Sequence, residues 1–467
     1  MEALQRLHNR GSISTGYEIT NSCKFDRDNS EAILTLNQAA GDQKTWTFSA
    51  WIKRSRLNFD WDNIFGAGTA IIIFNAENDL IVELYNGTTY KLITDRVFRD
   101  LHAWYHLVVV VDTTEGTASN RVKIYVNGIQ ETSLSTATYP PQDATFPLGG
   151  QGSSTNWIQL GRFYSGARHF SGYMADVYYL NGTAEDADAF GETDSDTGIW
   201  IPKAYTGSGY GTQGFHYKFD NASNLGEDSS GEGHDGNNLV NITAADQATD
   251  TPTNNFATLS PIFTNSGSAN YQTINEGATK FVNAGNAYRL AVANMGVTSG
   301  KWYWEVKATS VSAVMYMGIT YPSIWDTDYS LGGTIFVDDN NDPVRYNAGG
   351  RSAFGSAFGN GDIIAFALDM DASTPTMTVY KNNSSLGNLM SGLSIGGSGT
   401  AYLPPKEDGY FPKVGGYGAA TFECNFGGYT SGTPSSAASD ENGYGTFEYA
   451  PPSGYYALCT KNLAEYG

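Results

Sequence analysis

The chain is poor in cysteine, and its few cysteines form no recognisable pattern. Three occur in 467 residues, at Cys23, Cys424 and Cys459, with no Cys-x-x-Cys pair and no metal-ligand spacing. An odd number of widely spaced cysteines excludes a disulfide framework. We expect buried thiols in a protein made in a reducing cytoplasm.

Long apolar segments are also missing. The first residues, MEALQRLHNRGS, contain no apolar stretch of the kind that a signal peptide carries. No run approaches the 18 apolar residues of a transmembrane helix, so no membrane span is expected.

Positive charge is scarce. The chain has 27 Lys and Arg against 48 Asp and Glu, for a formal net charge of −21. A surface this acidic repels a phosphate backbone, so we expect no nucleic-acid partner.

Glycine and aromatic residues are abundant, with 54 Gly, 30 Tyr and 23 Phe. The same pattern of residue types occurs twice, in LVVVVDTTEGTASNRVKIYVNG (107–128) and in IIAFALDMDASTPTMTVYKNN (363–383). Each is an apolar run ending in Asp, a polar loop, and an alternating strand ending in Asn. This pattern predicts a β-hairpin followed by a tight turn.

The repetition predicts an all-β protein with two tandem antiparallel β-sandwiches. Alternation in TWTFSAWIKR and SGKWYWEV places Trp46, Trp302 and Trp304 in the cores. We expect a docking arm at 1–15, a first sandwich at 16–205, an extended strand and linker at 206–262, and a second sandwich with a C-terminal tail at 263–467. The linker assignment depends on the polar stretch DNASNLGEDSSGEGHDGNNL.

Two family resemblances support this division. Residues 45–182 resemble a laminin-G-like, concanavalin-type jelly roll through WTFSAWIKR, WYHLVVVVD, VKIYVNG, IQLGR and FSGYMADVYYLNG. Residues 299–427 resemble a SPRY domain through SGKWYWEV, YMGIT, GDIIAFALDMD, MTVYKNN and YFPKVGG.

Joined in this order, the two domains resemble virion proteins of tailed bacteriophages of the tail-fibre and host-recognition type. That resemblance implies a virion location, on a phage tail or surface appendage. It implies other virion proteins and bacterial surface polysaccharide as partners, and a homo-oligomer, a trimer by analogy. A capsid decoration or tail-assembly role is the alternative, and a polysaccharide depolymerase is a third possibility.

No catalytic constellation is evident. A glycosidase requires a close pair of carboxyl groups, and Glu83 and Glu305 are solitary acids on predicted strands. His102 and His106 have the spacing of a helical metal site, but His106 begins a predicted strand and is expected to pack in the interior. We therefore expect no enzyme activity and no cofactor.

Aromatic and amide side chains carry the binding hypothesis, because rings stack on sugar C–H faces and amides or carboxylates bond hydroxyl groups. The candidates for carbohydrate or receptor binding, all in predicted loops or at strand ends, are Trp61, Asp62, Asn63, Tyr164, Trp325 and Tyr329. The laminin-G resemblance also leaves Ca²⁺ open, with Asp62 and Asn63 as its possible ligands.

Overall fold

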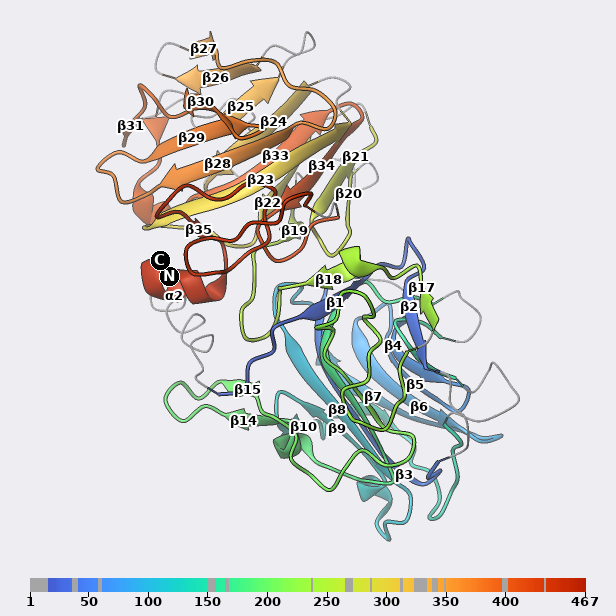
Figure 1. Ribbon diagram of the computed structural model, residues 1–467. Coiled ribbons are helices and arrows are strands. Elements are labelled where there is room, and N and C mark those ends of the chain that lie inside the picture. Colours follow the sequence, from blue (N-terminus) through green and yellow to red (C-terminus); the bar gives the residue numbers. More distant parts are fainter. Residues whose placement is uncertain are drawn as a thin grey trace. The chain divides into compact units, whose positions relative to one another are not determined.

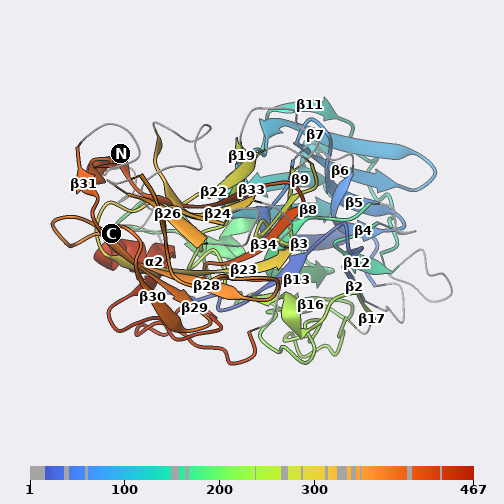
Figure 2. The same ribbon diagram turned by 90° about the horizontal axis from the view of Figure 1, so that it is seen from above.

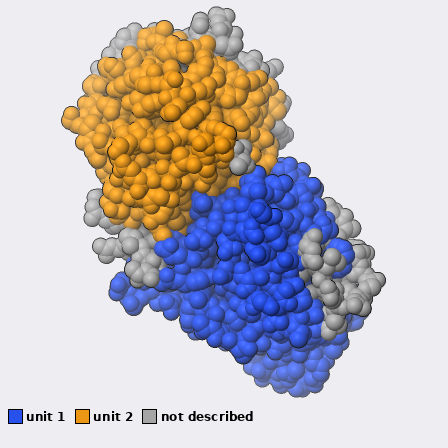
Figure 3. Space-filling view, in the orientation of Figure 1, with its two compact units in different colours: residues 1–253 blue, residues 254–467 orange. Residues whose placement is uncertain are grey.

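The computed structural model divides the chain into two compact units, residues 1–253 and residues 254–467 (Figure 3). The described residues are 16–35, 41–57, 61–148, 157–163, 168–236, 238–264, 272–285, 288–310, 314–322, 334–337, 343–347, 350–396, 402–431 and 434–467. The docking arm predicted at 1–15 lies outside them. In these ranges, no helix is long and apolar enough to cross a membrane.

Unit 1 is a sandwich of two antiparallel sheets (Figure 1). Sheet A has the order β10 (Ile129–Gln130), β9 (Val122–Val126), β8 (Tyr105–Asp112), β3 (Thr45–Arg54), β13 (Gly172–Asn181), β1 (Ser22–Phe25) and β18 (Gln247–Ala248), and β16 (Phe215–Tyr217) also pairs with β13. Sheet B has the order β11 (Leu134–Ala137), β7 (Thr89–Val97), β6 (Asp79–Tyr85), β5 (Ala70–Phe74), β4 (Asp62–Ala67), β12 (Ile158–Leu160), β2 (Ala32–Thr35) and β17 (Asn238–Val240).

Alternation along the strands builds the core between these sheets. Trp46, Phe48, Ala50 and Ile52 of β3 are fully buried in one cluster with residues of sheet B such as Phe65. The outer side of sheet A is covered by the chain that follows β13, including β14 (Gly191–Thr193), β15 (Trp200–Pro202) and the short helix η2 (Ala187–Ala189). Helix η1 (Ala118–Asn120) closes the β8–β9 hairpin.

The segment 206–262, predicted as an extended strand and linker, contains a strand at 215–217, and the part of it up to residue 253 belongs to unit 1. Strands β16, β17 and β18 of this segment pair with β13, β2 and β1, and helix η3 (Ala244–Asp246) precedes β18. The segment also supplies apolar side chains to the core of unit 1, namely Phe215, Tyr217, Phe219, Leu225 and Ile242. Its polar composition predicted a loop because these side chains are widely spaced.

Unit 2 is a second two-sheet sandwich, and Figure 2 shows its two layers. Sheet C has the order β19 (Leu259–Thr264), β22 (Arg289–Ala293), β33 (Phe411–Tyr417), β24 (Val314–Thr320), β25 (Thr334–Val337), β26 (Pro343–Asn347) and β27 (Gly350–Ala353). Sheet D has the order β20 (Gln272–Asn275), β21 (Lys280–Asn283), β34 (Ala420–Asn425), β23 (Lys301–Ser310), β28 (Ile363–Asp369), β29 (Thr376–Lys381) and β30 (Ser384–Asn388).

The C-terminal tail packs on sheet D. Strand β35 (Tyr456–Ala457) runs parallel to β23, and helix α2 (Thr460–Tyr466) ends the chain. Phe447 and Cys459 of the tail are buried against Tyr303 and Ala365 of the sheet. The remaining short elements of unit 2 are β31 (Ser394–Ile395), β32 (Tyr402–Leu403) and η5 (Lys406–Asp408).

The all-β, two-sandwich prediction is therefore confirmed. Both repeated phrases form antiparallel hairpins, β8–β9 and β28–β29. Trp46, Trp302 and Trp304 are buried in the two cores. The three cysteines are buried free thiols, as predicted.

Candidate functional site

The predicted binding residue Trp61 lies where β4 begins, on the side of sheet B that faces away from the core. Its backbone has φ +60°, a conformation that bulky residues rarely adopt and that costs about 1–3 kcal/mol. The half-buried ring packs with Phe163 on a floor of isoleucines formed by Ile71, Ile73, Ile81 and Ile93. Residues held in sparsely populated backbone conformations cluster at functional sites.

Strand register explains this floor, because residues directly opposite in adjacent antiparallel strands point to the same face. Two rows cross sheet B on its outer side. The first contains Gln159, Gly66, Ile71, Glu83 and Lys91. The second contains Asn63, Ile73, Ile81 and Ile93. The rows form an apolar strip with polar side chains at its ends.

Two arginines border the strip. The guanidinium carbon of Arg168 lies 3.7 Å from the centroid of the Trp61 ring and 5.6 Å from that of Phe163. Arg162 donates from Nε to Oε1 of Gln159 at 2.9 Å. Burial lowers the pKa of Arg162 from its ordinary value, although an arginine stays protonated at neutral pH. We call this surface, made of Trp61, Phe163, Arg162, Arg168 and the four isoleucines, the platform.

Asp62, predicted as a ligand-binding residue, lies in the interior. Its Oδ2 is 3.3 Å from Nη2 of Arg54, both side chains have no exposed surface, and its Oδ1 accepts the backbone N–H of Ser171 at 3.1 Å. A carboxylate that neutralises a buried guanidinium cannot reach an external sugar.

Asn63 is also buried, on the outer side of sheet B. Its Nδ2 donates to the carbonyl oxygen of Arg162 at 2.7 Å, while its Oδ1 has no hydrogen-bond partner among the described residues. Its contact with Arg162 makes Asn63 a support for the platform.

The Ca²⁺ possibility does not fit Asp62 and Asn63, because Arg54 occupies the carboxylate of the first and the amide of the second bonds a backbone carbonyl. Among the described residues, no group of three or more His, Cys, Asp and Glu is arranged to hold a metal ion. The other three predicted binding residues, Tyr164, Trp325 and Tyr329, lie outside the described ranges.

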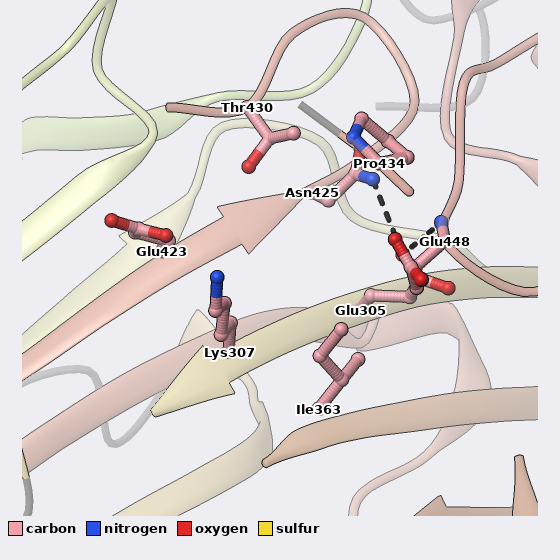
Figure 4. A pocket seen from close by; sticks show the side chains of 8 residues that line it. All are labelled: Glu305, Lys307, Ile363, Glu423, Asn425, Thr430, Pro434 and Glu448. Carbon is pink, nitrogen blue, oxygen red and sulfur yellow. Dashed lines mark hydrogen bonds between the residues drawn. The ribbon is translucent and has the colours of Figure 1, made fainter. Parts of the chain in front are cut away.

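A hollow in unit 2 brings together acids that the sequence left apart (Figure 4). Its empty volume is about 330 Å³, part of it open to solvent. The lining residues are Glu305, Lys307, Ile363, Glu423, Asn425, Thr430, Pro434 and Glu448. The strand pairing of β23 with β34 sets Glu305 opposite Asn425 and Lys307 opposite Glu423.

The carboxylate of Glu305 in this hollow is occupied by hydrogen bonds from the protein itself. Its two carboxylate oxygens accept the backbone N–H groups of Glu448 and Tyr449, both at 2.9 Å, as well as bonds from Tyr303 and Asn425. Burial raises the pKa of this carboxyl above its ordinary value, and the donors oppose that effect. Glu448 is bonded in turn by the backbone N–H and hydroxyl of Ser435. Glu305 therefore fastens the tail to sheet D, while Glu448 joins two parts of the tail to each other.

The histidines form interior contacts. His106 is fully buried, accepts the indole N–H of Trp200 at Nδ1 (3.0 Å) and lies 2.9 Å from Ser49 Oγ through Nε2. Since Nδ1 is an acceptor, the ring is neutral with its proton on Nε2. Burial lowers its pKa to about 3. The packing role predicted for this residue is confirmed.

A buried tyrosine, aspartate and histidine cluster in unit 1 was not predicted. Asp176 is 2.6 Å from Nε2 of His216 and accepts the hydroxyl groups of Tyr17 and Tyr178. Asp176 sits at a bulge in β13 with φ +50°. Asp176, Tyr178 and His216 are each at least 95% buried, so this cluster stabilises the sandwich.

Comparison with known proteins gives one family match. Residues 28–189 match the Concanavalin A-like lectin/glucanases superfamily. This range covers most strands of unit 1, including those that form the platform. A search of curated proteins finds no match.

Solved structures similar to the chain include the SPRY domain of human HERC1, at 15% identity over 36% of this chain and 96% of that one, with a TM-score of 0.27. A second human SPRY domain is 18% identical over 33% of this chain and 94% of that one, with a TM-score of 0.25. A Bacteroides ovatus protein, provisionally assigned to carbohydrate binding, is 18% identical over 41% of this chain and 63% of that one, with a TM-score of 0.26.

Proposed function

We propose that the protein binds carbohydrate without modifying it, and that the platform of unit 1 is the binding surface. The observation that carries the proposal is the family match over 28–189 combined with an aromatic and polar surface on the outer side of sheet B. Because Arg168 lies against the Trp61 ring, the solvent-exposed parts of Trp61 and Phe163, rather than a free ring face, would supply the apolar contact for sugar C–H groups, and the flanking polar groups can bond hydroxyls.

Binding without catalysis is proposed because the acids Asp62, Glu83 and Glu305 already have other partners. Asp62 pairs with Arg54, Glu83 pairs with Lys91 at 2.8 Å, and Glu305 accepts four hydrogen bonds. Glycoside hydrolysis requires one carboxyl group that donates a proton and another that attacks or activates water. A carboxylate held by a cation or by several donors is poorly suited to either role.

The resemblance of the joined domains to tailed-phage virion proteins supports a more specific role. We propose attachment of a phage tail fibre or receptor-binding appendage to bacterial surface glycans. Several copies on one particle would convert weak single-site binding into strong attachment through a high effective concentration. A capsid decoration or tail-assembly role is the alternative.

The direct test measures binding of the full chain to a panel of bacterial surface polysaccharides by calorimetry. Trp61→Ala should weaken binding about tenfold or more, because it removes both the apolar surface of the ring and the support that it gives to Arg168, a loss on the order of 1–3 kcal/mol. Tyr417→Ala, which truncates an exposed ring of unit 2, is the matched control and should bind normally. Equal binding by both variants would refute the platform as the site.

Two further measurements address the alternatives. Chromatography of polysaccharide after incubation should show no shortening, and any shortening would contradict binding without catalysis. Purified protein should compete with phage for adsorption to the host. If it binds no glycan and does not compete, the decoration role is favoured.

A further inference from the structure

Arg162 and Arg168 differ from most basic residues of unit 1. Lys24, Lys53, Arg54, Arg56, Lys91 and Arg96 all form ion pairs with carboxylates. Arg162 and Arg168 have no carboxylate within 4 Å among the described residues. In a chain with a net charge of −21, two neighbouring arginines with no carboxylate partner in the part of the chain that the structure describes are unexpected.

Local structure holds both arginines beside the platform. The backbone N–H of Phe163 donates to the carbonyl oxygen of Arg168 at 3.2 Å, and Arg162 forms a β-bridge with His169. This short ladder fixes the backbone of both residues. The guanidinium carbon of Arg168 lies 3.7 Å from the centroid of the Trp61 ring, and Arg162 is held by Gln159.

On this basis we propose that the platform recognises acidic polysaccharides, with Arg162 and Arg168 contacting a carboxylate or sulfate group of the polymer. This inference rests on the proposed carbohydrate-binding function and assigns its ligand class. A guanidinium group presents two parallel N–H donors that match the two oxygens of a carboxylate or sulfate.

Three features make the arrangement suitable. Contact with the Trp61 ring restricts the Arg168 side chain in advance, so less side-chain freedom is lost on binding. Partial burial removes water from Arg162, and a bound anion would offset that cost. The acid within the strip, Glu83, is engaged by Lys91 and does not compete for the arginines.

The overall charge of the protein would not attract an acidic polysaccharide. At a net charge of −21 the whole protein repels a polyanion. Affinity for an acidic polymer would therefore have to come from a local site, and it should fall with added salt because the contacts are between charges.

The test uses the full chain with dextran, dextran sulfate and polygalacturonate in parallel titrations. Dextran and dextran sulfate share a backbone, so their comparison isolates the sulfate, while polygalacturonate presents carboxylates. We expect at least one acidic polymer to bind about tenfold or more tighter than dextran, the effect of one charge-assisted contact. Arg162→Gln/Arg168→Gln should reduce its affinity to that of dextran.

Two variants keep the experiment interpretable. Lys123→Gln removes a cation from sheet A, where Lys123 pairs with Asp186, and should leave binding unchanged. Arg168→Lys keeps the charge but loses the planar fork, and should bind with intermediate affinity. Thermal unfolding of each variant checks that the fold is intact.

The outcomes separate this inference from the proposed function. If the protein binds neutral glycans and Arg162→Gln/Arg168→Gln binds them equally well, the proposed specificity for acidic polymers is wrong, while the proposal of carbohydrate binding stands. An equal loss of affinity in Lys123→Gln would also overturn it, since the effect would then be general charge. Binding to none of these polymers and to no surface polysaccharide would overturn both proposals.

Discussion

The buried ion pair between Arg54 and Asp62 gives the sharpest test of how unit 1 is held together. Both side chains have no exposed surface, and Asp62 supplies the counter-charge at 3.3 Å. In Asp62→Ala the Arg54 guanidinium would keep the Phe98 carbonyl oxygen at 2.7 Å and Asn78 Oδ1 at 3.1 Å, but it would lose its counterion. The backbone N–H of Ser171 would lose its acceptor as well.

Removing one partner of a buried ion pair costs about 3–5 kcal/mol. In a domain of this size, 1 kcal/mol lowers the melting temperature by roughly 2–4 °C. Asp62→Ala should therefore melt about 6–20 °C below the unmodified protein in a calorimetric scan. This cost arises because Arg54 is left as a buried charge without a counterion, and it does not mean that the intact ion pair stabilises the fold by the same amount.

The matched control is Arg54→Met/Asp62→Leu, which replaces both charges with apolar side chains of similar size. Such replacements are often neutral or stabilising, so this variant should recover most of the lost stability. It should also bind polysaccharide normally, because neither charge reaches the surface. A melting temperature for Asp62→Ala within about 2 °C of the unmodified protein would refute the reasoning.

Three further predictions follow from buried groups. Burial lowers the pKa of His106 to about 3, whereas a histidine in the unfolded chain has a pKa of about 6.5. As the pH falls, the unfolded state therefore binds a proton before the folded state does. Stability should fall from pH 6.5 towards 3, and His106→Gln should make that fall shallower in pH-dependent melts. Glu305→Ala leaves the N–H groups of Glu448 and Tyr449 without their acceptor. Each unsatisfied group costs about 1–3 kcal/mol, so hydrogen exchange in residues 434–459 should accelerate roughly tenfold or more. Unchanged exchange would show that other contacts hold the tail. Burial raises the pKa of all three cysteine thiols, so a thiol reagent should label none in the folded protein and three in urea, and labelling under native conditions would contradict the packing.

The sequence predicted the sheets well because strand alternation is a local signal. TWTFSAWIKR and SGKWYWEV alternate over their whole length, and β3 and β23 form there with Trp46, Trp302 and Trp304 in the cores. Each repeated phrase contains both strands of its hairpin and the turn between them. No distant residue is needed to recognise these elements.

The site could not be predicted to the same extent, because its contacts join distant parts of the chain. Trp61 was a candidate by residue type, but nothing near it in the sequence indicates that Arg168 covers its ring. Asp62 had the residue type of a sugar ligand, yet its partner is Arg54 on β3, a strand of the opposite sheet. A basic residue eight positions before an aspartate was the only available signal, and that spacing is not specific.

The segment 206–253 shows how a polar sequence can still be part of a core, and it gives a final prediction. Its buried apolar residues are Phe215, Tyr217, Phe219, Leu225 and Ile242, each at most 5% exposed. Burying one such side chain stabilises a protein by about 1.5–3 kcal/mol, so five contribute on the order of 10 kcal/mol, which is comparable to the whole stability of a domain. The segment also brings Asp246 and Asp250 to the buried ammonium groups of Lys24 and Lys53.

A fragment of residues 16–205 should therefore not fold, whereas residues 16–253 should. The longer fragment should show dispersed amide resonances and one cooperative melting transition, and the shorter should show neither. Because both fragments contain every strand from β1 to β15, the comparison isolates the contribution of the later segment. A shorter fragment that unfolds cooperatively near the melting temperature of the longer one would show that the first sandwich is complete at residue 205 and that the following strands only decorate it.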